Sequence, residues 1–195
     1  MGDIAITLYV HAGTLKNGIT YLKVRSEYLE AWGLEKDDVL HEALLNSYRI
    51  LPPRIYDFKK MMYTPGYAGE DFLNMDPYFI SDKKKKEGIC LSVKGLSNGA
   101  VAVLYPGVIK KLVEFMDGGF YVVFSSVHEA LIYSSKLCSL EELENLLRTS
   151  NARMTFQKEF LTDKVYYYCK EEDKFIMLRG SMKMLVTTIR MDEEN

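Results

Sequence analysis

Residues 165–178 read VYYYCKEEDKFIML, and this segment has the composition of two paired strands. Tyrosine and β-branched residues favour strands, and the acidic triplet at 171–173 is typical of the turn between them. We therefore predict a hairpin with strands at 165–169 and 175–178. Because alternate side chains of a strand face opposite sides, one row of tyrosines faces the core and the other is half-exposed. We assign Tyr167 to a binding surface, since tyrosine is enriched in protein interfaces.

Further strands are predicted before this hairpin and after it. Residues 4–10 alternate apolar and polar side chains, and Asn17-Gly18 supplies a turn signal before a second strand at 19–24. We expect this opening hairpin, like the tyrosine hairpin, to join antiparallel sheet. The remaining candidate strands cover residues 89–93, 120–124, 130–133 and 183–191.

Helical periodicity predicts the elements that pack on the strands. Apolar residues from Leu40 to Leu51 recur at helical spacing, with acidic side chains on the first turn and Pro52-Pro53 at the end. Ser139 and Glu142 form a capping box, which indicates the start of another helix. Shorter helices are predicted at 26–32, 54–62 and 106–116.

The order of these elements predicts an α+β fold. Strand pairs and helices come in clusters, which is typical of an antiparallel sheet built from β-hairpins with several helices packed on it. A length of 195 residues fits a single domain over 1–195. Within it we predict an irregular insertion at about 64–87, where chain breakers alternate with aromatic residues. This insertion closes with four lysines at 83–86, which we place in a loop.

Composition and charge exclude several classes of protein. The chain has 25 Lys and Arg against 27 Asp and Glu, so its net charge of −2 lacks the basic excess of a phosphate-backbone binder. No apolar run approaches the roughly 18 residues of a membrane span, and the N-terminus lacks the features of a signal peptide. The cysteines Cys90, Cys138 and Cys169 are scattered, which suits a reducing compartment. We therefore expect a cytoplasmic protein that does not enter a membrane.

The segment Ser125-Ser126-Val127-His128-Glu129 gathers the residue types of a hydrolase. A hydroxyl, an imidazole and a carboxylate can act as nucleophile, base and orienting group, so Ser125 or Ser126 with His128 and Glu129 is one hypothesis. The competing interpretation is a serine-rich bend between two strands, whose hydroxyls satisfy backbone groups. We favour the bend, because neighbouring residues of a strand point to opposite faces.

Motifs for metals and cofactors are incomplete in this chain. His41-Glu42 begins like the zinc motif HExxH, but Leu45 occupies the position of the second histidine. The glycines at 95, 99 and 107 match no phosphate-binding loop. We therefore predict no metal site and no cofactor.

The insertion at about 64–87 predicts a surface for another protein. Aromatic side chains supply contact area at modest entropic cost, and lysines speed association with an acidic partner. A nucleic acid is a second possible partner for the lysines. The predicted binding residues are Tyr67, Phe72, Tyr78, Lys83, Lys84, Lys85, Lys86 and, on the tyrosine hairpin, Tyr167.

Several segments together resemble an uncharacterised family of gut anaerobic bacteria, which is described only as a domain of unknown function. The most specific are Tyr105-Pro106-Gly107 and the 125–129 segment, and the likeness covers roughly residues 5 to 178. Members of that family are longer at the N-terminus, so this chain resembles about the C-terminal two-thirds of them, and residues 64–87 match poorly. Members often sit on conjugative or phage-like elements. The resemblance implies an intracellular bacterial protein and carries over no catalytic residue.

These features predict a non-catalytic intracellular protein-binding module. Its partner would be a host or element-encoded protein, and an inhibitor or modulator of a CRISPR or other defence nuclease fits the mobile-element context. The first alternative is the hydrolase described above. The second is a nucleic-acid-binding regulator, which the net charge of −2 disfavours. The sequence leaves the oligomeric state open.

Overall fold

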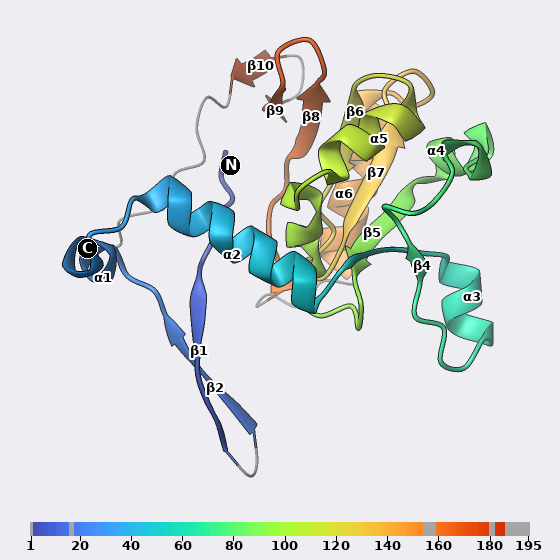
Figure 1. Ribbon diagram of the computed structural model, residues 1–195. Coiled ribbons are helices and arrows are strands. Elements are labelled where there is room, and N and C mark those ends of the chain that lie inside the picture. The colour runs from blue at the N-terminus through green and yellow to red at the C-terminus, as the bar shows by residue number, and fades with distance from the viewer. Residues whose placement is uncertain (1, 16–17, 154–158, 180–181, 186–195) are drawn as a thin grey trace.

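The computed structural model describes residues 2–15, 18–153, 159–179 and 182–185 (Figure 1). Most of these residues form an α+β domain around one antiparallel sheet, which confirms the predicted fold class. The order of its eight strands is β10-β9-β8-β6-β7-β5-β3-β4. Their bounds are Pro53–Tyr56 (β3), Glu70–Asp71 (β4), Ile89–Val93 (β5), Phe120–Val123 (β6), Ala130–Ser134 (β7), Val165–Cys169 (β8), Lys174–Arg179 (β9) and Met182–Leu185 (β10).

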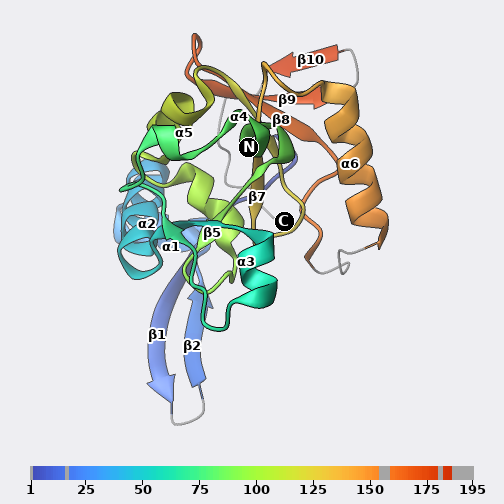
Figure 2. The same ribbon diagram turned by 90° about the vertical axis from the view of Figure 1, so that its right-hand side faces the viewer.

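Helices cover both faces of this sheet (Figure 2). One face packs against α5, the 3-10 helix η2 and the inner side of α2, and the other packs against α6. The helices are Ser26–Trp32 (α1), Lys36–Ile50 (α2), Phe58–Tyr63 (α3), Pro77–Phe79 (η1), Asp82–Glu87 (α4), Gly99–Leu104 (η2), Val108–Met116 (α5) and Leu140–Arg153 (α6). Among the described residues, no helix is both long and apolar enough to cross a membrane.

The strands of the tyrosine hairpin are β8 and β9, as predicted, and they lie next to β6 in the sheet. Tyr166 and Tyr168 point into the core beneath α5, whereas Tyr167 is half-buried on the opposite face. The Tyr166 hydroxyl donates a hydrogen bond to the Asp3 carboxylate, and the Thr162 hydroxyl donates to the same group at 2.8 Å. The N-terminal residues are therefore fastened to β8.

The opening hairpin forms an antiparallel sheet of its own. Its strands are Tyr9–Leu15 (β1) and Gly18–Lys23 (β2), and neither pairs with a described strand of the main sheet. The first strand begins at Tyr9 rather than at the predicted Ile4, because Ile4 packs against the main core. Asn17, the predicted turn residue, lies outside the described residues, as does the 186–191 part of the last predicted strand.

Two local predictions between residues 54 and 87 are wrong. Residues 54–56 belong to strand β3 rather than to a helix, because they pair with both β4 and β5. The lysine run lies in helix α4 rather than in a loop, since the Ser81 hydroxyl accepts a hydrogen bond from Lys84 N–H at the helix start. In between, Glu70–Asp71 adds an edge strand and Phe72 enters the core.

Candidate functional site

The 125–129 segment is a bend that connects β6 and β7. The Ser125 hydroxyl donates to Glu129 Oε1 at 2.5 Å, and the Ser126 hydroxyl accepts from His128 N–H at 3.0 Å. The Ser92 hydroxyl of β5 donates to the His128 carbonyl at 2.6 Å. Hydroxyl groups therefore satisfy backbone groups in and beside the bend, as the structural interpretation expects.

Both ring nitrogens of His128 face a partner. The backbone N–H of Asn98 donates to Nδ1 at 3.1 Å, and Nε2 lies 3.6 Å from Glu159 Oε1. A neutral imidazole that accepts at Nδ1 carries its proton at Nε2, so in this state neither nitrogen can take a proton from a serine. The geometry favours a structural role, in which His128 joins the bend to the start of η2 and to Glu159.

A second candidate site is the α3–α4 surface, which we define as the apolar side chains of α3 together with the four lysines of α4. No residue of α3 is buried. Its apolar side chains are exposed by 54 % at Phe58, 36 % at Met61, 71 % at Met62 and 77 % at Tyr63. Because the apolar side of a surface helix normally faces the core, this helix presents an unusual patch to solvent.

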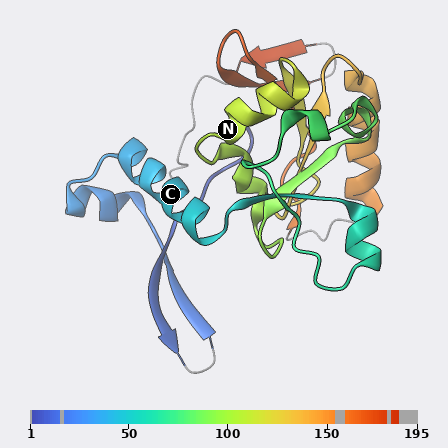
Figure 3. The ribbon, with the colours of Figure 1, turned by 45° about the vertical axis from the view of Figure 1, so that its right-hand side comes forward.

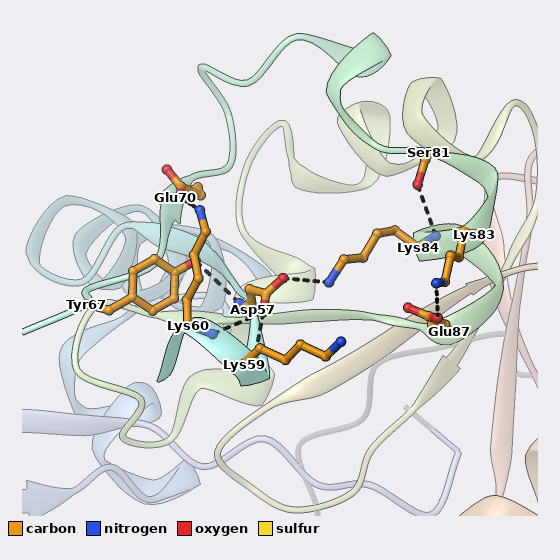
Figure 4. Close-up of polar contacts among 9 residues, drawn as sticks. All are labelled: Asp57, Lys59, Lys60, Tyr67, Glu70, Ser81, Lys83, Lys84 and Glu87. Atoms are coloured by element: carbon orange, nitrogen blue, oxygen red, sulfur yellow. Dashed lines mark hydrogen bonds and ion pairs between the residues drawn. The ribbon is translucent and has the colours of Figure 1, made fainter. Parts of the chain in front are cut away.

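Asp57 positions both helices of this surface (Figure 4). Its Oδ1 atom accepts hydrogen bonds from the backbone N–H groups of Lys59 and Lys60, at 2.9 and 3.2 Å, and so caps the start of α3. Its Oδ2 atom lies 2.6 Å from Lys84 Nζ of α4. The hydrogen bond from Lys84, supported by the backbone bond from Lys60, lowers the pKa of Asp57 to about 2. One ionised carboxylate therefore starts α3 and links it to α4.

Acidic neighbours partly neutralise the charge of α4. Besides the Lys84–Asp57 pair, Lys83 lies 3.7 Å from Glu87 and Lys85 lies 3.4 Å from Asp82. Ion pairs at or near the surface contribute little to stability, but these three reduce the field that the lysine run presents. The run is therefore a weaker attractant for a polyanion than its four consecutive lysines indicate.

The predicted binding residues are divided between the core and three surfaces. The α4 lysines and Tyr67 lie near α3, since the Tyr67 hydroxyl accepts from Asp57 N–H at 3.3 Å. Tyr78 is 96 % exposed, but it lies on η1, which packs against α5. Tyr167 of β8 packs beside Tyr121 of β6, and β8 lies four strands away from β3 in the sheet. Tyr78 and Tyr167 are therefore not part of the α3–α4 surface.

Phe72 belongs to the core rather than to a binding surface. Its side chain is completely buried and stacks on Phe115 of α5, with ring centroids 5.3 Å apart. The prediction that Phe72 contacts a partner is wrong for this reason. An aromatic residue among chain breakers has the same local sequence whether it anchors a loop to the core or faces solvent.

The sequence interpretation missed the apolar side chains of α3. Phe58, Met61 and Met62 follow the helical spacing i, i+3, i+4 directly after a capping aspartate, so the sequence does contain an amphipathic signal. That signal normally predicts a core-facing helix. No local pattern reveals that the rest of the chain leaves this side of α3 uncovered.

Comparison with known proteins supplies a family but no activity. A model described as a family of unknown function, DUF5688, matches residues 1–170. No curated protein and no solved structure matches the chain. Among the described residues, no group of His, Cys, Asp and Glu side chains could hold a metal ion. The matched region includes both the 125–129 bend and the α3–α4 surface. The chain therefore belongs to DUF5688, a family of unknown function.

Proposed function

We propose that this protein is a non-catalytic protein-binding module that acts through the α3–α4 surface. The observation that carries the proposal is the exposure of every apolar side chain of α3, including Met62 at 71 % and Tyr63 at 77 %. Contiguous exposed apolar side chains flanked by charges are typical of protein interaction sites. Methionine adapts to irregular surfaces and tyrosine supplies a large rigid contact area. Together they suit a contact that α3 makes with another protein.

The polar contacts around α3 support this proposal, because they hold the helix without covering it. Asp57 fixes its first turn, and the side chain of Lys60, in the middle of the helix, pairs with Glu70 of β4 at 3.0 Å. A surface that is already ordered loses less conformational entropy when it binds. The exposed patch is therefore preorganised for binding, because its backbone is already held in a helix.

The two parts of the surface have different roles in the proposed complex. The apolar side chains of α3 would form the desolvated centre of the interface and would govern the dissociation rate. The lysines of α4 would lie at the rim, where charges mainly raise the association rate and lose their effect as salt increases. The proposed partner therefore presents an apolar surface beside acidic side chains.

The two alternative functions have weaker support. The hydrolase hypothesis needs an imidazole that can accept a proton from serine, whereas His128 Nδ1 already accepts from Asn98 N–H. The nucleic-acid hypothesis needs excess positive charge, whereas Lys83, Lys84 and Lys85 each face a carboxylate. The protein-binding proposal requires neither feature.

A more specific proposal concerns the biological context. The resemblance to a family of gut anaerobic bacteria that often sits on mobile elements supports a cytoplasmic bacterial protein that modulates a host protein. For a protein of a mobile element, an inhibitor of a CRISPR or other defence nuclease is the version we propose. This version rests on the resemblance, whereas the binding module rests on the exposure of α3.

A comparison of three forms of the protein in an affinity capture tests the binding module. The forms are the wild type, the double variant Met62→Ser with Tyr63→Ser, and the control Leu137→Ser with Leu146→Ser. Leu137 and Leu146 are also exposed, by 38 and 40 %, but lie before α6 and on it. We expect quantitative mass spectrometry of anaerobic bacterial lysates to show a protein that the wild type and the control capture and the α3 variant does not. Equal capture by all three forms would contradict the proposal.

The inhibitor version has a separate test in bacteria with an active CRISPR nuclease. We expect expression of the wild type to raise the plating efficiency of a targeted phage, and the Met62→Ser, Tyr63→Ser variant to have no effect. An unchanged plating efficiency with the wild type would contradict inhibition of that nuclease. Such a result would leave the capture experiment, and the proposal of a protein-binding module that it tests, unaffected.

A further inference from the structure

A groove lies between helix α5 and the turn that joins β8 to β9. These two elements are at the end of the molecule opposite the β1–β2 hairpin (Figure 3). The groove has a volume of about 470 Å³, which falls within the usual range of small-molecule sites. Its lining comes from one side of α5, from the end of β8 and from the turn, so it joins parts of the chain that are distant in sequence.

Apolar side chains form the floor of this groove. Ile109 and Val113 lie one helical turn apart on α5, and both line the groove while they pack against the main core. Tyr168 of β8 lines it from the sheet. Its ring stacks on Phe120, with centroids 5.1 Å apart, and meets Phe175 edge-on at 5.2 Å. The floor is therefore held in place by the core and needs no rearrangement to receive an apolar group.

The two carboxylates that line the groove already have partners within the protein. Glu114 Oε2 lies 3.9 Å from Lys111 Nζ, one turn back on the same helix. Asp173 accepts a hydrogen bond from the hydroxyl of Tyr168. Both carboxylates remain exposed, so they would repel a ligand that carries two or more negative charges.

The two lysines that line the groove lack such partners. The side chains of Lys110 and Lys170 are exposed, and among the described residues neither ammonium group has an ion-pair or hydrogen-bond partner. Asp117 and Glu171 are acidic neighbours of Lys170, but they pair with other groups and do not line the groove. An apolar floor is thus combined with two ammonium groups that are available to an anion.

We propose that this groove binds a small organic carboxylate with an apolar body. The body would lie on Ile109, Val113 and Tyr168, and the single negative charge would be shared by Lys110 and Lys170. The apolar contact would supply most of the affinity, and the lysines would select the anion over neutral and cationic analogues. This inference uses no residue of the α3–α4 surface, so it stands independently of the proposed function.

Three probes with nearly the same apolar body test this assignment: phenylacetate, phenethyl alcohol and phenethylamine. Each is titrated into the ¹⁵N-labelled full chain, and the backbone amide signals of Val113, Tyr168 and Lys170 are followed by NMR. We expect phenylacetate to shift these signals saturably, with a dissociation constant of about 1 mM or below. The alcohol and the amine should bind about tenfold more weakly, because they lack the negative charge.

A matched pair of double variants separates a bound carboxylate from a general effect of protein charge. Lys110→Gln with Lys170→Gln removes both ammonium groups of the groove. Lys59→Gln with Lys94→Gln removes two exposed lysines that do not line it. We expect the groove variant to raise the dissociation constant of phenylacetate about tenfold and to leave that of phenethyl alcohol unchanged. The control variant should change neither constant.

Four results would overturn the inference. The first is the absence of a saturable shift at the lining residues with phenylacetate up to about 10 mM. The second is binding of the alcohol or the amine that is as tight as binding of phenylacetate. The third is an unchanged affinity for phenylacetate in the groove variant. The fourth is an equal loss in the groove variant and the control, since that would reflect protein charge rather than a site.

Discussion

Strand β8 and helix α3 are both rich in aromatic and apolar side chains, but the fold treats them in opposite ways. In β8, Tyr166 is completely buried, and its hydroxyl donates to Asp3. In α3, Tyr63 is 77 % exposed and no residue is buried. The strand has neighbours on both edges and helices over both faces, whereas the short helix lies beside the sheet edge formed by β3 and β4. Composition alone therefore does not identify an interaction surface, and position in the fold decides which apolar and aromatic segments remain available to a partner.

The largest expected effect is the loss of the buried tyrosine. Tyr166→Ala removes a core side chain and leaves the Asp3 carboxylate without one of its donors, so we expect it to destabilise the protein by about 3–5 kcal/mol. Urea denaturation gives the free energy of unfolding. Tyr166→Phe separates the two causes, since it keeps the ring and removes only the hydroxyl. A loss below about 1 kcal/mol for Tyr166→Ala would show that β8 is not core as described.

A substitution in the half-buried 125–129 bend should have an effect on stability smaller than one in β8 and larger than one on α3. His128→Ala removes the acceptor for Asn98 N–H and the group that faces Glu159, so we expect a loss of about 1–3 kcal/mol. Thermal and urea denaturation measure it, with His41→Ala on the exposed side of α2 as a matched histidine control. An unchanged stability, together with loss of a hydrolytic activity, would instead favour the hydrolase.

A smaller effect is expected at Asp57, and it should depend on pH. Because the fold lowers the pKa of this carboxyl to about 2, its contribution is present above the unfolded pKa and is lost as the pH falls toward 2. Asp57→Asn keeps a capping side chain but loses the ion pair with Lys84, so we expect a loss of about 1 kcal/mol at neutral pH.

Urea denaturation of the wild type and of Asp57→Asn between about pH 7 and pH 2 follows this dependence. The difference in unfolding free energy should stay constant down to about pH 4 and then shrink. Lys84→Met should give a similar loss at neutral pH, because it removes the same ion pair from the other side. A difference that persists at the lowest pH would contradict the role given to Asp57.

The smallest effect on stability is expected on α3 itself. Met62→Ser with Tyr63→Ser changes side chains that are 71 and 77 % exposed, so we expect the unfolding free energy to change by no more than about 0.5 kcal/mol per site. Urea denaturation measures this change, with Tyr166→Ala as the comparison. A loss of several kcal/mol would mean that α3 is packed in solution, and the variant would no longer be a clean test of binding.

The regular parts of the fold could be predicted from the sequence because their signals are local. The strand-favouring composition of β6 and β8, the periodicity of α2 and the capping box of Ser139 and Glu142 each depend on residues close in the chain, and each element is present in the structure. The capping box is complete, since Ser139 N–H donates to Glu142 Oε2 and Glu142 N–H donates to Ser139 Oγ.

The candidate site could be predicted only in part, because it depends on contacts between distant segments. The lysines of α4 were expected on a surface, but their pairing with Asp57 joins residues 27 positions apart at Lys84. Phe72 was predicted to lie on a binding surface, but its ring stacks on Phe115 of α5 in the core. The exposure of α3 follows from the absence of a covering element over its described residues, which no pattern within residues 58–63 encodes.

Hydroxyl-radical footprinting tests the central claim most directly, because it compares the same side chains in the free protein and in a complex isolated from its host. Methionine and aromatic side chains react readily when exposed, so Met62 and Tyr63 of α3 report on the proposed surface. Phe160, which is 47 % exposed and lies between α6 and β8 in the chain, serves as a reference outside that surface. We predict that labelling of Met62 and Tyr63 falls strongly in the complex while labelling of Phe160 is unchanged. Equal labelling of Met62 and Tyr63 in the free and bound protein would contradict the claim that α3 binds the partner.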